Sequence, residues 1–497
     1  MKTLGRIGST VCVLIFFLAM VLLLSYAWVA SMFKNATLDV IVIQLSLPLT
    51  GMDPRYYYYA GVVVLAVVLF TFLYARFLWR VSTTPTFWGI RSGVVMAAAR
   101  CLAPFLLMGS LVLLERKYEL VEFLFPGEPY STYVEDNYYM PTPDEFTFPG
   151  GKNNLVVLIL ESMEWTFDDP RLFKPSLIPR LSEMRKTDSG FMGHRQCTGT
   201  EYSIAGFISI LMGMPSEAGL TARNMVDLFL GKSEPEESLN PSDPPGDFRD
   251  YSVMGILDRH GYRVSFFCAA DARFNDFGGL MERSTKSCDI RDFVYYSRTR
   301  PEVTKKQNAW GLLDGYLYDR AREYLTELEA DGPFMMVVET VDTHPPGHVE
   351  ENLPKPYGDF RDAYVQADIL ATDFISWIQE QPFGPKTTIV VVGDHLLGEA
   401  GMASMKNLPP IDTRSIMALV VNSRVEAASD LRERTFASWD LAPTILEATG
   451  AVFPERRFAL GTSLFSPQLN LLERDGFSKC SKALKKHSRL RKTRYRQ

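Results

Sequence analysis

The stretch TTIVVVGDH, residues 387–395, decides the fold, because a run of β-branched apolar residues ends there in Gly393, Asp394 and His395. Similar apolar runs recur at NNLVVLILES (153–162), YRVSFFCAA (262–270), FMMVVETVD (334–342) and MALVVN (417–422). Runs that are apolar on both faces are typical of strands in a parallel sheet whose faces are both covered by helices. We therefore predict a largely parallel central sheet.

Between these runs, residues 308–330 and 360–379 have apolar residues at helical spacing. Strands that alternate with helices predict an α/β domain, to which we assign residues 151–478. The stretch 232–250 is rich in Pro and acidic residues and is expected to form a surface loop. A charged, Pro-rich linker is expected at 116–150.

The N-terminal part, residues 1–115, contains three long apolar segments at about 11–30, 57–79 and 93–115. A helix of about twenty residues crosses the roughly 30 Å hydrocarbon layer, so we predict three transmembrane helices. The first segment is longer than the apolar part of a signal peptide, which favours an uncleaved anchor. Residues 38–51 are too few to span and are expected to lie at the membrane interface.

The basic residues beside these segments predict the orientation of the chain in the membrane. Lys2 and Arg6 precede the first segment, Arg76 lies near the end of the second, and Arg80 and Arg91 lie between the second and the third. Because cytoplasmic loops carry an excess of Lys and Arg, we place the N-terminus in the cytoplasm. Three crossings then put everything after the third segment outside the cytoplasm.

Composition excludes several other classes of protein. The chain has 52 Lys and Arg against 58 Asp and Glu, a net charge of −6, which disfavours a nucleic-acid-binding protein. Six Cys are too few for a disulfide-built scaffold, and no C-x-x-C pair suggests a zinc ribbon or a thioredoxin motif. Cys268 and Cys288 fall in the exported domain, where either a local disulfide or two buried thiols would be possible.

Polar residues end three of the apolar runs. These ends are Glu161-Ser162, Asp342-Thr343-His344 and Gly393-Asp394-His395. The carboxyl ends of parallel strands meet at one edge of a sheet, so these side chains are expected to converge. Carboxylate and imidazole ligands together suit a divalent ion such as Mn²⁺, Mg²⁺ or Zn²⁺. The sequence therefore predicts a metal site at this edge.

A nucleophile is expected from CTGTEYSIAGFISILMG, residues 197–213, which continues as an apolar helix. Thr200 would lie at the helix N-terminus, where a metal-bound hydroxyl could attack phosphorus. An ordinary N-cap is the alternative explanation for a Thr at this place. The spacing does not choose between Thr198 and Thr200, and Cys197 is a rival that an extracytoplasmic location disfavours.

The motifs LxLES, GTEYSIAG, DTHPPG and VVGDH, after a multi-span anchor, resemble the membrane-anchored sulfatase-like phosphotransferases of the alkaline-phosphatase-like superfamily. The resemblance is nearest to the periplasmic glucan phosphoglycerol transferases and the lipoteichoic acid synthases. It rests there on the segments 199–206, 272–276, 308–314 and 341–347. The arylsulfatase signature C/S-x-P-x-R is missing, so sulfate ester hydrolysis is disfavoured.

The resemblance implies a role for seven residues of this sequence. The implied metal ligands are Glu161, Thr200, Asp394 and His395, with Thr200 also the nucleophile, and the implied substrate-binding residues are His344, Arg273 and Trp310. Trp310 is equally well explained as a core aromatic residue. Of the possible metals we favour Mn²⁺, because an imidazole ligand suits a softer ion than Mg²⁺.

The resemblance further implies transfer of glycerol phosphate from phosphatidylglycerol to a periplasmic or cell-envelope glycan, through a phospho-threonine intermediate. It implies a bacterial inner membrane location with a periplasmic catalytic domain. Phosphoethanolamine transfer, metal-dependent hydrolysis of phosphodiesters or sulfate esters, and a silent anchored binding module are the alternatives. The tail, residues 479–497, holds nine basic residues and no acidic one, and is either a solvated end or a contact to anionic lipid.

Overall fold

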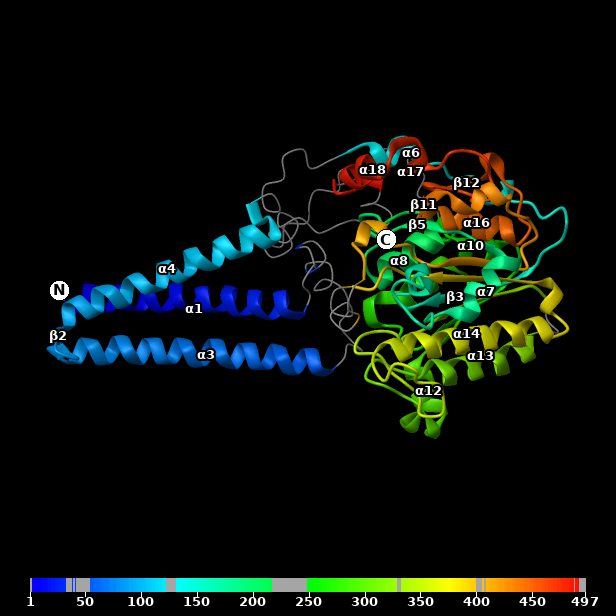
Figure 1. Ribbon diagram of the computed structural model, residues 1–497. Coiled ribbons are helices and arrows are strands. Elements are labelled where there is room, and N and C mark those ends of the chain that lie inside the picture. Colours follow the sequence, from blue (N-terminus) through cyan, green and yellow to red (C-terminus); the bar gives the residue numbers. More distant parts are fainter. Residues whose placement is uncertain are drawn as a thin grey trace. The chain divides into compact units, whose positions relative to one another are not determined.

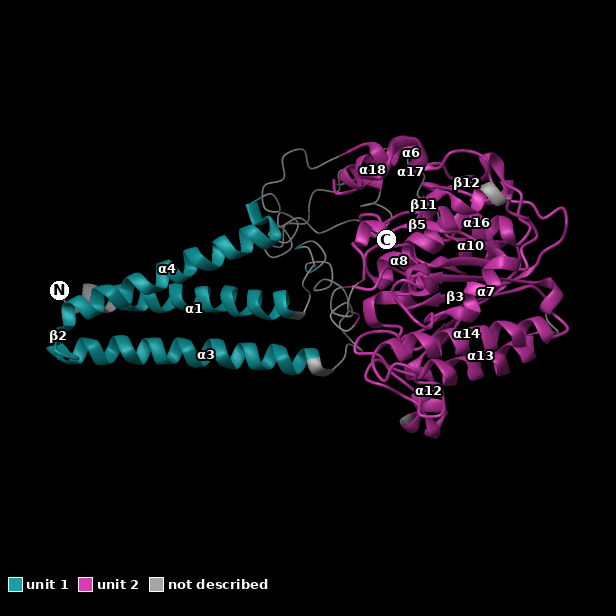
Figure 2. Cartoon of the chain, in the orientation of Figure 1, with its two compact units in different colours: residues 1–42, 52–127, 219–232 teal, residues 43–51, 128–218, 233–497 magenta. Residues whose placement is uncertain are grey.

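The computed structural model describes residues 2–32, 38, 41, 54–121, 131–216, 248–328, 332–398, 405, 408–486 and 488–490. The chain divides into two compact units, shown in Figure 2. One comprises residues 1–42, 52–127 and 219–232, and the other comprises 43–51, 128–218 and 233–497. Nearly all of the expected interfacial segment 38–51 and of the expected loop 232–250 lies outside the described residues.

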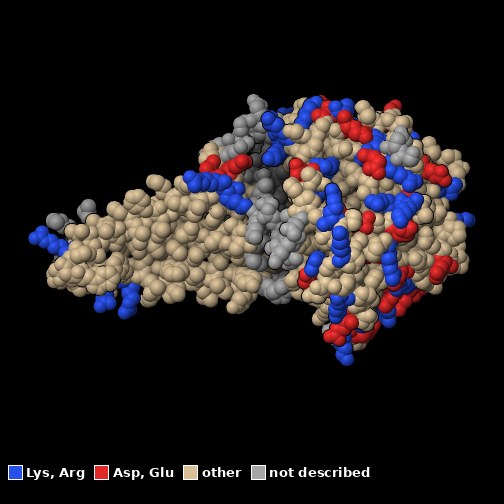
Figure 3. Space-filling model, in the orientation of Figure 1, with Lys and Arg blue, Asp and Glu red and all other residues tan. Residues whose placement is uncertain are grey.

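The first unit is built from three long helices: α1 (Lys2–Met32), α3 (Pro54–Thr83) and α4 (Ser92–Tyr118). They run side by side, and all three are long and apolar enough to cross a membrane (Figure 1). Figure 3 shows that their surface carries almost no charged side chains between its two ends. Such a surface suits a hydrocarbon surrounding, so the three predicted apolar helices are confirmed.

One charged residue, Arg100, lies inside the apolar stretch of α4, and it is held between two helices. Arg100 of α4 donates a hydrogen bond from Nη2 to Oγ of Ser9 on α1, over 2.9 Å. Nearby, the Tyr74 hydroxyl of α3 donates to the carbonyl of Ala99 over 2.8 Å. Arg100 thus faces a neighbouring helix, as expected for a charge within a membrane span.

The second unit contains a seven-stranded sheet in the order β4-β10-β9-β3-β8-β6-β7. Its strands are β3 (Asn154–Leu160), β4 (Ser189–Gly190), β6 (Arg263–Cys268), β7 (Cys288–Arg291), β8 (Phe334–Glu339), β9 (Thr387–Gly393) and β10 (Ala418–Val421). The five strands from β9 to β7 are parallel. Only β10 and β4 at the other edge run antiparallel to their neighbours. The predicted α/β fold with a largely parallel sheet is confirmed.

Both faces of the sheet are buried under helices (Figure 1). Alternate residues of β3 enter opposite cores: Leu155, Val157 and Ile159 on one face, and Val156, Leu158 and Leu160 on the other. The first face packs against helices that include α8 (Ser203–Met212), α10 (Val253–Arg259) and α16 (Leu441–Ala448). The second packs against α13 (Asp314–Leu328) and α14 (Arg361–Glu380).

The predicted linker and tail are in part integral to the α/β unit. Residues 131–150 pack on it through the short helix α6 (Tyr133–Asn137), the buried Phe146 and a β-bridge from Thr147 to Val452. At the other end, α18 (Phe477–Leu484) buries Cys480 and Leu484 completely. The basic residues of α18 occupy the outer face of an amphipathic helix. The prediction from net charge considered only this face and did not include the apolar face that packs on the core.

All six cysteines lie in the described parts of the chain, and all carry free thiols. The considered disulfide between Cys268 and Cys288 is therefore absent. Cys288 begins β7 opposite Val264, while Cys268 ends β6 four residues further along the parallel pair. Four residues of strand amount to about 13 Å, well beyond the reach of a disulfide.

Candidate metal centre and nucleophile

The metal ligands predicted at two strand ends lie together in the structure. Ligand atoms of Glu161, Asp394 and His395 all lie within 4.8 Å of one another. Nε2 of His395 is 3.7 Å from Oε1 of Glu161 and 3.3 Å from Oδ2 of Asp394. Because Leu160 of β3 pairs with Gly393 of β9, the next residues of both strands emerge at the same level. Two carboxylates and one imidazole fit Mn²⁺ or Zn²⁺ and are also compatible with Mg²⁺.

The backbone around the cluster aims these side chains. Ser162 adopts a left-handed conformation with φ of 52°, which turns the chain sharply after Glu161. Oδ1 of Asp394 accepts hydrogen bonds from the amides of Ser162 and His395, each over 2.8 Å. Gly393 permits the close approach of the two segments, since a Cβ there would lie 2.0 Å from the carbonyl oxygen of Met163.

Burial and the neighbouring charges both shift the pKa values of the cluster residues, and for Glu161 and His395 the two effects are opposite. Burial raises the pKa of Asp394, and the nearby charge of Glu161 raises it further. Burial also acts to raise the pKa of Glu161, but the imidazoles of His395 and His344 and two serine hydroxyls reverse the effect and lower it. Burial alone would lower the pKa of His395, yet the two carboxylates outweigh it and raise that pKa. A divalent cation would relieve this repulsion between buried carboxylates.

Two serine hydroxyls lie at the cluster. Oγ of Ser162 donates to Oε1 of Glu161 over 2.7 Å and lies 3.5 Å from Nδ1 of His395. Oγ of Ser203 donates to Oε2 of Glu161 over 3.1 Å and lies 3.3 Å from Nε2 of His395. Thr200 is fully buried, and its hydroxyl donates over 2.8 Å to the carbonyl of Cys197, whose amide donates back to it. In this structure the Thr200 hydroxyl thus bonds to the backbone of its own turn, and its expected roles as metal ligand and nucleophile stay a prediction.

The position of the Thr200 hydroxyl has a local physical cause. Residues 197–200 form a closed turn in which the Thr200 amide also donates to the Cys197 carbonyl, over 3.1 Å, and Gly199 has φ of 87°. The helix α8 consequently begins at Ser203, three residues later than expected. Burial raises the pKa of the rival Cys197 thiol well above its usual value, which leaves it unreactive.

A buried ion pair supports the segment that follows His395. Glu164 and Arg414 are both fully buried and pair through two contacts, one of them 2.9 Å from Arg414 Nε to Glu164 Oε2. Oε1 of Glu164 also accepts from the amide of Leu397, and Arg414 Nη2 donates to the Leu397 carbonyl, over 2.8 and 2.9 Å. These residues carried no recognisable motif in the sequence, because the pair joins positions 250 residues apart.

The loop after β8 carries both Asp342 and His344, and the Asp342 carboxylate bonds to neighbouring segments of the protein. Asp342 accepts from Asn308 Nδ2 over 2.7 Å and from the amide of Asp314 over 2.9 Å. Asp314 reciprocates by accepting from the amides of Val341 and Asp342. Burial raises the pKa of Asp342 well above its usual value. Asp342 is thus a structural residue of this loop and does not belong to the metal cluster.

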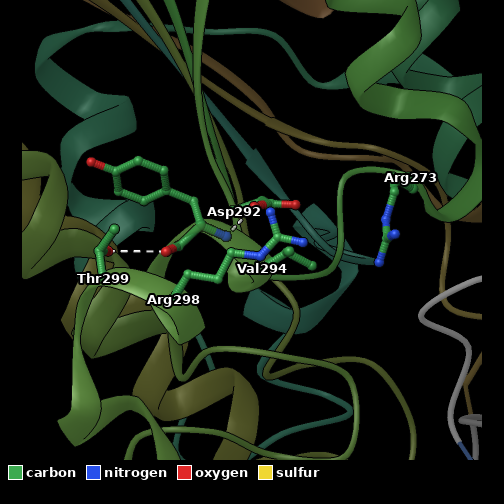
Figure 4. Close-up of a pocket in the computed structure, with 6 residues that line it drawn as sticks. Arg273, Asp292, Val294, Arg298 and Thr299 are labelled. Carbon is green, nitrogen blue, oxygen red and sulfur yellow. Dashed lines mark hydrogen bonds between the residues drawn. The ribbon is translucent and has the colours of Figure 1, made fainter.

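Of the other predicted substrate-binding residues, Trp310 packs on His344, while Arg273 pairs with an acidic residue two positions earlier. The two ring centroids of Trp310 and His344 are 4.0 Å apart. Arg273 pairs with Asp271 over 2.6 Å and is 63% exposed. It lines a surface pocket together with Arg298, and Figure 4 shows this pocket.

Comparison with known proteins agrees with this architecture. Residues 153–451, more than half of the chain, match the sulfatase family. Phosphoglycerol transferase I of Xanthomonas axonopodis pv. citri (strain 306) is 28% identical over 254 residues, which cover 49% of this chain and 34% of that protein. The Escherichia coli O6:K15:H31 protein of the same name is 27% identical over 336 residues, 65% of this chain and 40% of its own. The chain thus matches two fifths or less of these relatives' length.

A solved structure extends the likeness of fold to nearly the whole chain. The integral membrane protein lipooligosaccharide phosphoethanolamine transferase A from Neisseria meningitidis aligns over 92% of this chain and 87% of its own, with a TM-score of 0.51 and 13% identity. That likeness concerns the fold alone. Since the family match spans most of the α/β unit, including β3, β9 and the residues at their ends, the chain belongs to the sulfatase family.

Proposed function

We propose that this chain is a metal-dependent phosphoglycerol transferase with Ser203 as its nucleophile. The observation that carries the proposal is the Ser203 hydroxyl, which lies against both Glu161 and His395 and, unlike the Ser162 hydroxyl beside them, stands at the start of a helix. Thr200, three residues earlier in the chain, is the alternative nucleophile. A hydroxyl beside a divalent-metal ligand set is the arrangement that nucleophilic phosphoryl transfer needs. The donor we propose is phosphatidylglycerol and the acceptor a hydroxyl of a cell-envelope glycan. The names of the relatives from Xanthomonas and Escherichia coli support this choice.

In the first step, the Ser203 hydroxyl loses its proton to solvent and its Oγ forms a bond to the phosphorus of the lipid phosphodiester. The bond from phosphorus to the diacylglycerol oxygen breaks. The metal, when bound, lowers the pKa of the hydroxyl and neutralises charge on the phosphoryl oxygens. Ser203 begins the ten-residue helix α8, whose N-terminal amides favour the developing negative charge. His344 gives a proton to the departing diacylglycerol oxygen.

In the second step, an acceptor hydroxyl attacks the phosphoglyceryl-serine intermediate. His344, now neutral, takes the proton of that hydroxyl. The bond between Ser203 and phosphorus breaks, and the departing Ser203 oxygen regains a proton from solvent. The charge of His344 lowers the pKa of Glu161, so the two groups interact electrostatically. The Trp310 ring packs against His344 and would restrict its orientation.

We propose that the three apolar helices embed the protein in the bacterial inner membrane, with the N-terminus cytoplasmic and the α/β unit periplasmic. The distribution of Lys and Arg around the helices supports this orientation. Membrane attachment would keep the site near its lipid donor and raise the donor's effective concentration.

The test uses the full-length protein in vesicles that contain phosphatidylglycerol labelled in its head-group glycerol. We expect release of diacylglycerol, label on Ser203 by peptide mapping, and passage of the label to an added glycan. A label that maps to Thr200, or its absence from the protein at every time point, would overturn the proposed nucleophile. Labelled phosphatidylethanolamine serves as the rival donor, and free labelled glycerol phosphate without acceptor labelling would identify a hydrolase instead.

A further inference from the structure

A surface pocket of about 290 Å³ lies between the loops that follow β6 and β7. Its lining residues come from the loop after β6 and from the start and end of α12 (Phe293–Thr299), and they are Arg273, Asp292, Val294, Tyr295, Arg298 and Thr299. In Figure 4, Arg298 extends from α12 toward the side of the pocket on which Arg273 lies. The pocket therefore combines two guanidinium groups from different segments.

Both guanidinium groups have bonding capacity left for a ligand. Arg273 donates from Nε and Nη2 to Asp271, over 3.0 and 2.6 Å, and its side chain remains 63% exposed. Arg298 is exposed and makes no hydrogen bond or ion pair with any residue that the structure describes. A guanidinium presents a planar fork of donors that matches the oxygens of a phosphate group.

Asp292, the acidic residue of the pocket, does not compete with a ligand for the two guanidinium groups. Oδ1 of Asp292 accepts from the amide of Tyr295 over 2.7 Å, and Oδ2 accepts from the amide of Ala272 over 2.9 Å. Asp292 is only 7% exposed, so its charge faces backbone amides while the two arginines face solvent. Its two hydrogen bonds also tie the Arg273 loop to the helix that carries Arg298.

The pocket and the metal cluster lie along the same edge of the sheet. β3, β8, β6 and β7 are neighbours in that order and parallel, so the loops after them all leave from their carboxyl ends. Two to three strand spacings separate the end of β3 from the ends of β6 and β7, which is about 10–14 Å. Between them, the ring of Phe274 lies 6.2 Å from Trp310, which in turn packs on His344.

We propose that this pocket binds a second phosphate group of the substrate, about one sugar-phosphate unit from the phosphorus that reacts. The proposal rests on the proposed function and deepens it. The favoured source is a glycan acceptor that already carries a phosphodiester or phosphomonoester, so the enzyme would prefer substituted chains. The other source of the same chemistry is the phosphate of a neighbouring donor lipid.

The experiment compares two glycan acceptors of equal length, one neutral and one bearing a phosphate, with the full-length protein in phosphatidylglycerol vesicles. We expect the wild type to use the phosphorylated acceptor with at least about tenfold higher kcat/KM, the scale of a charge-assisted hydrogen bond. Arg298→Gln should remove this preference while transfer to the neutral acceptor stays unchanged. The matched control is Arg300→Gln, since Arg300 is also exposed on this segment but pairs with Glu323.

The outcomes separate this proposal from the one on which it rests. Equal use of both acceptors by the wild type, with Ser203-dependent transfer intact, overturns the phosphate pocket alone. Absence of any Ser203-dependent transfer overturns the proposed function. If Arg298→Gln instead slows diacylglycerol release before any acceptor is added, the second phosphate belongs to the donor lipid. A preference that survives in Arg298→Gln also overturns the pocket.

Discussion

The Ser203 hydroxyl donates to Oε2 of Glu161 over 3.1 Å, and this contact joins the first residue of α8 to the end of β3. The first prediction follows from it. Ser203→Ala should lower transfer by at least about a thousandfold, because residues of a catalytic set are individually indispensable. Ser203→Thr should keep part of the activity, since it preserves the hydroxyl. The measurement is diacylglycerol release by the full-length protein.

Thr200→Val is the matched control for that series. The Thr200 hydroxyl bonds to the Cys197 backbone, so activity should persist while the free energy of unfolding falls by about 1–3 kcal/mol. If Thr200→Val were inactive but folded and metal-loaded, Ser203 would not be the nucleophile.

Metal content provides the second prediction. Glu161→Ala, Asp394→Ala and His395→Ala should each lose tightly bound divalent ion, because each removes one ligand atom from the cluster. Elemental analysis of the purified full-length variants is the measurement, and Mn²⁺ is the ion expected in the wild type. Asp373→Ala, which breaks an exposed ion pair with Arg180, is the control and should keep its metal. Stoichiometric metal in all three cluster variants would disprove the site.

Loss of one partner of the buried ion pair should be costly. Glu164→Ala leaves the charge of Arg414 buried without compensation and should lower the free energy of unfolding by about 3–5 kcal/mol. Because Glu164 also accepts from the Leu397 amide, the variant should bind metal more weakly as well. Thermal unfolding in detergent and metal titration measure the two effects. Replacing both partners with Leu and Met should restore most of the stability but not the metal affinity, and an unrestored stability would contradict this account.

Acid should destabilise the α/β unit through His194 of β5 (Gly193–Arg195). This side chain is fully buried, stacks on Phe436 and lies 2.9 Å from the Ser438 hydroxyl. Burial lowers its pKa to about 3. Between about pH 3 and 6.5 the unfolded chain therefore binds the extra proton, and stability rises with pH.

The slope from this one histidine is at most about 1.4 kcal/mol per pH unit, and it vanishes above about pH 6.5. His194→Gln should flatten the stability profile in this window. Unfolding midpoints of the detergent-solubilised protein across the window are the measurement. Parallel profiles for the wild type and His194→Gln would show that another group is responsible.

The C-terminal helix offers a further stability test. Leu484 of α18 is fully buried, so Leu484→Ala should cost about 2–5 kcal/mol. Lys482→Gln on the exposed face should change stability by no more than about 0.5 kcal/mol. Equal effects of the two substitutions would mean that α18 is not packed on the core. Removal of the whole tail would confuse lost packing with lost charge, so point variants are the better probe of any lipid contact.

The sheet and the metal cluster followed from the sequence because the same physical rule governs both. A strand buried on both faces must be apolar along its length, and the first polar residues mark its end. Glu161, Asp394 and His395 are such residues on neighbouring parallel strands, so register alone brings them together. Asp342 also follows a buried strand, but its carboxylate bonds to Asn308 and to the amide of Asp314. No local sequence pattern predicts these bonds.

The nucleophile depended on a helix boundary, where sequence patterns are least informative. The turn from Cys197 to Thr200 shifts the start of α8 by three residues, and this moves the proposed role from Thr200 to Ser203. The Glu164–Arg414 pair could not be predicted from the sequence for a different reason. Its two residues are 250 positions apart and come into contact only in the folded domain. Burial of α18 was missed because its basic face dominates the composition of the tail.

The reciprocal bonds between Asp314 and Asp342 bear on how this enzyme could be redesigned. Each carboxylate bonds to backbone amides of the other's segment, so the start of α13 and the start of the loop after β8 are held together. Asn308 adds a third connection, because its side chain donates a hydrogen bond to Asp342. A substitution at any of these three positions would loosen two segments at once. A library aimed at new acceptors should therefore keep all three residues fixed and vary the solvent-facing positions around them.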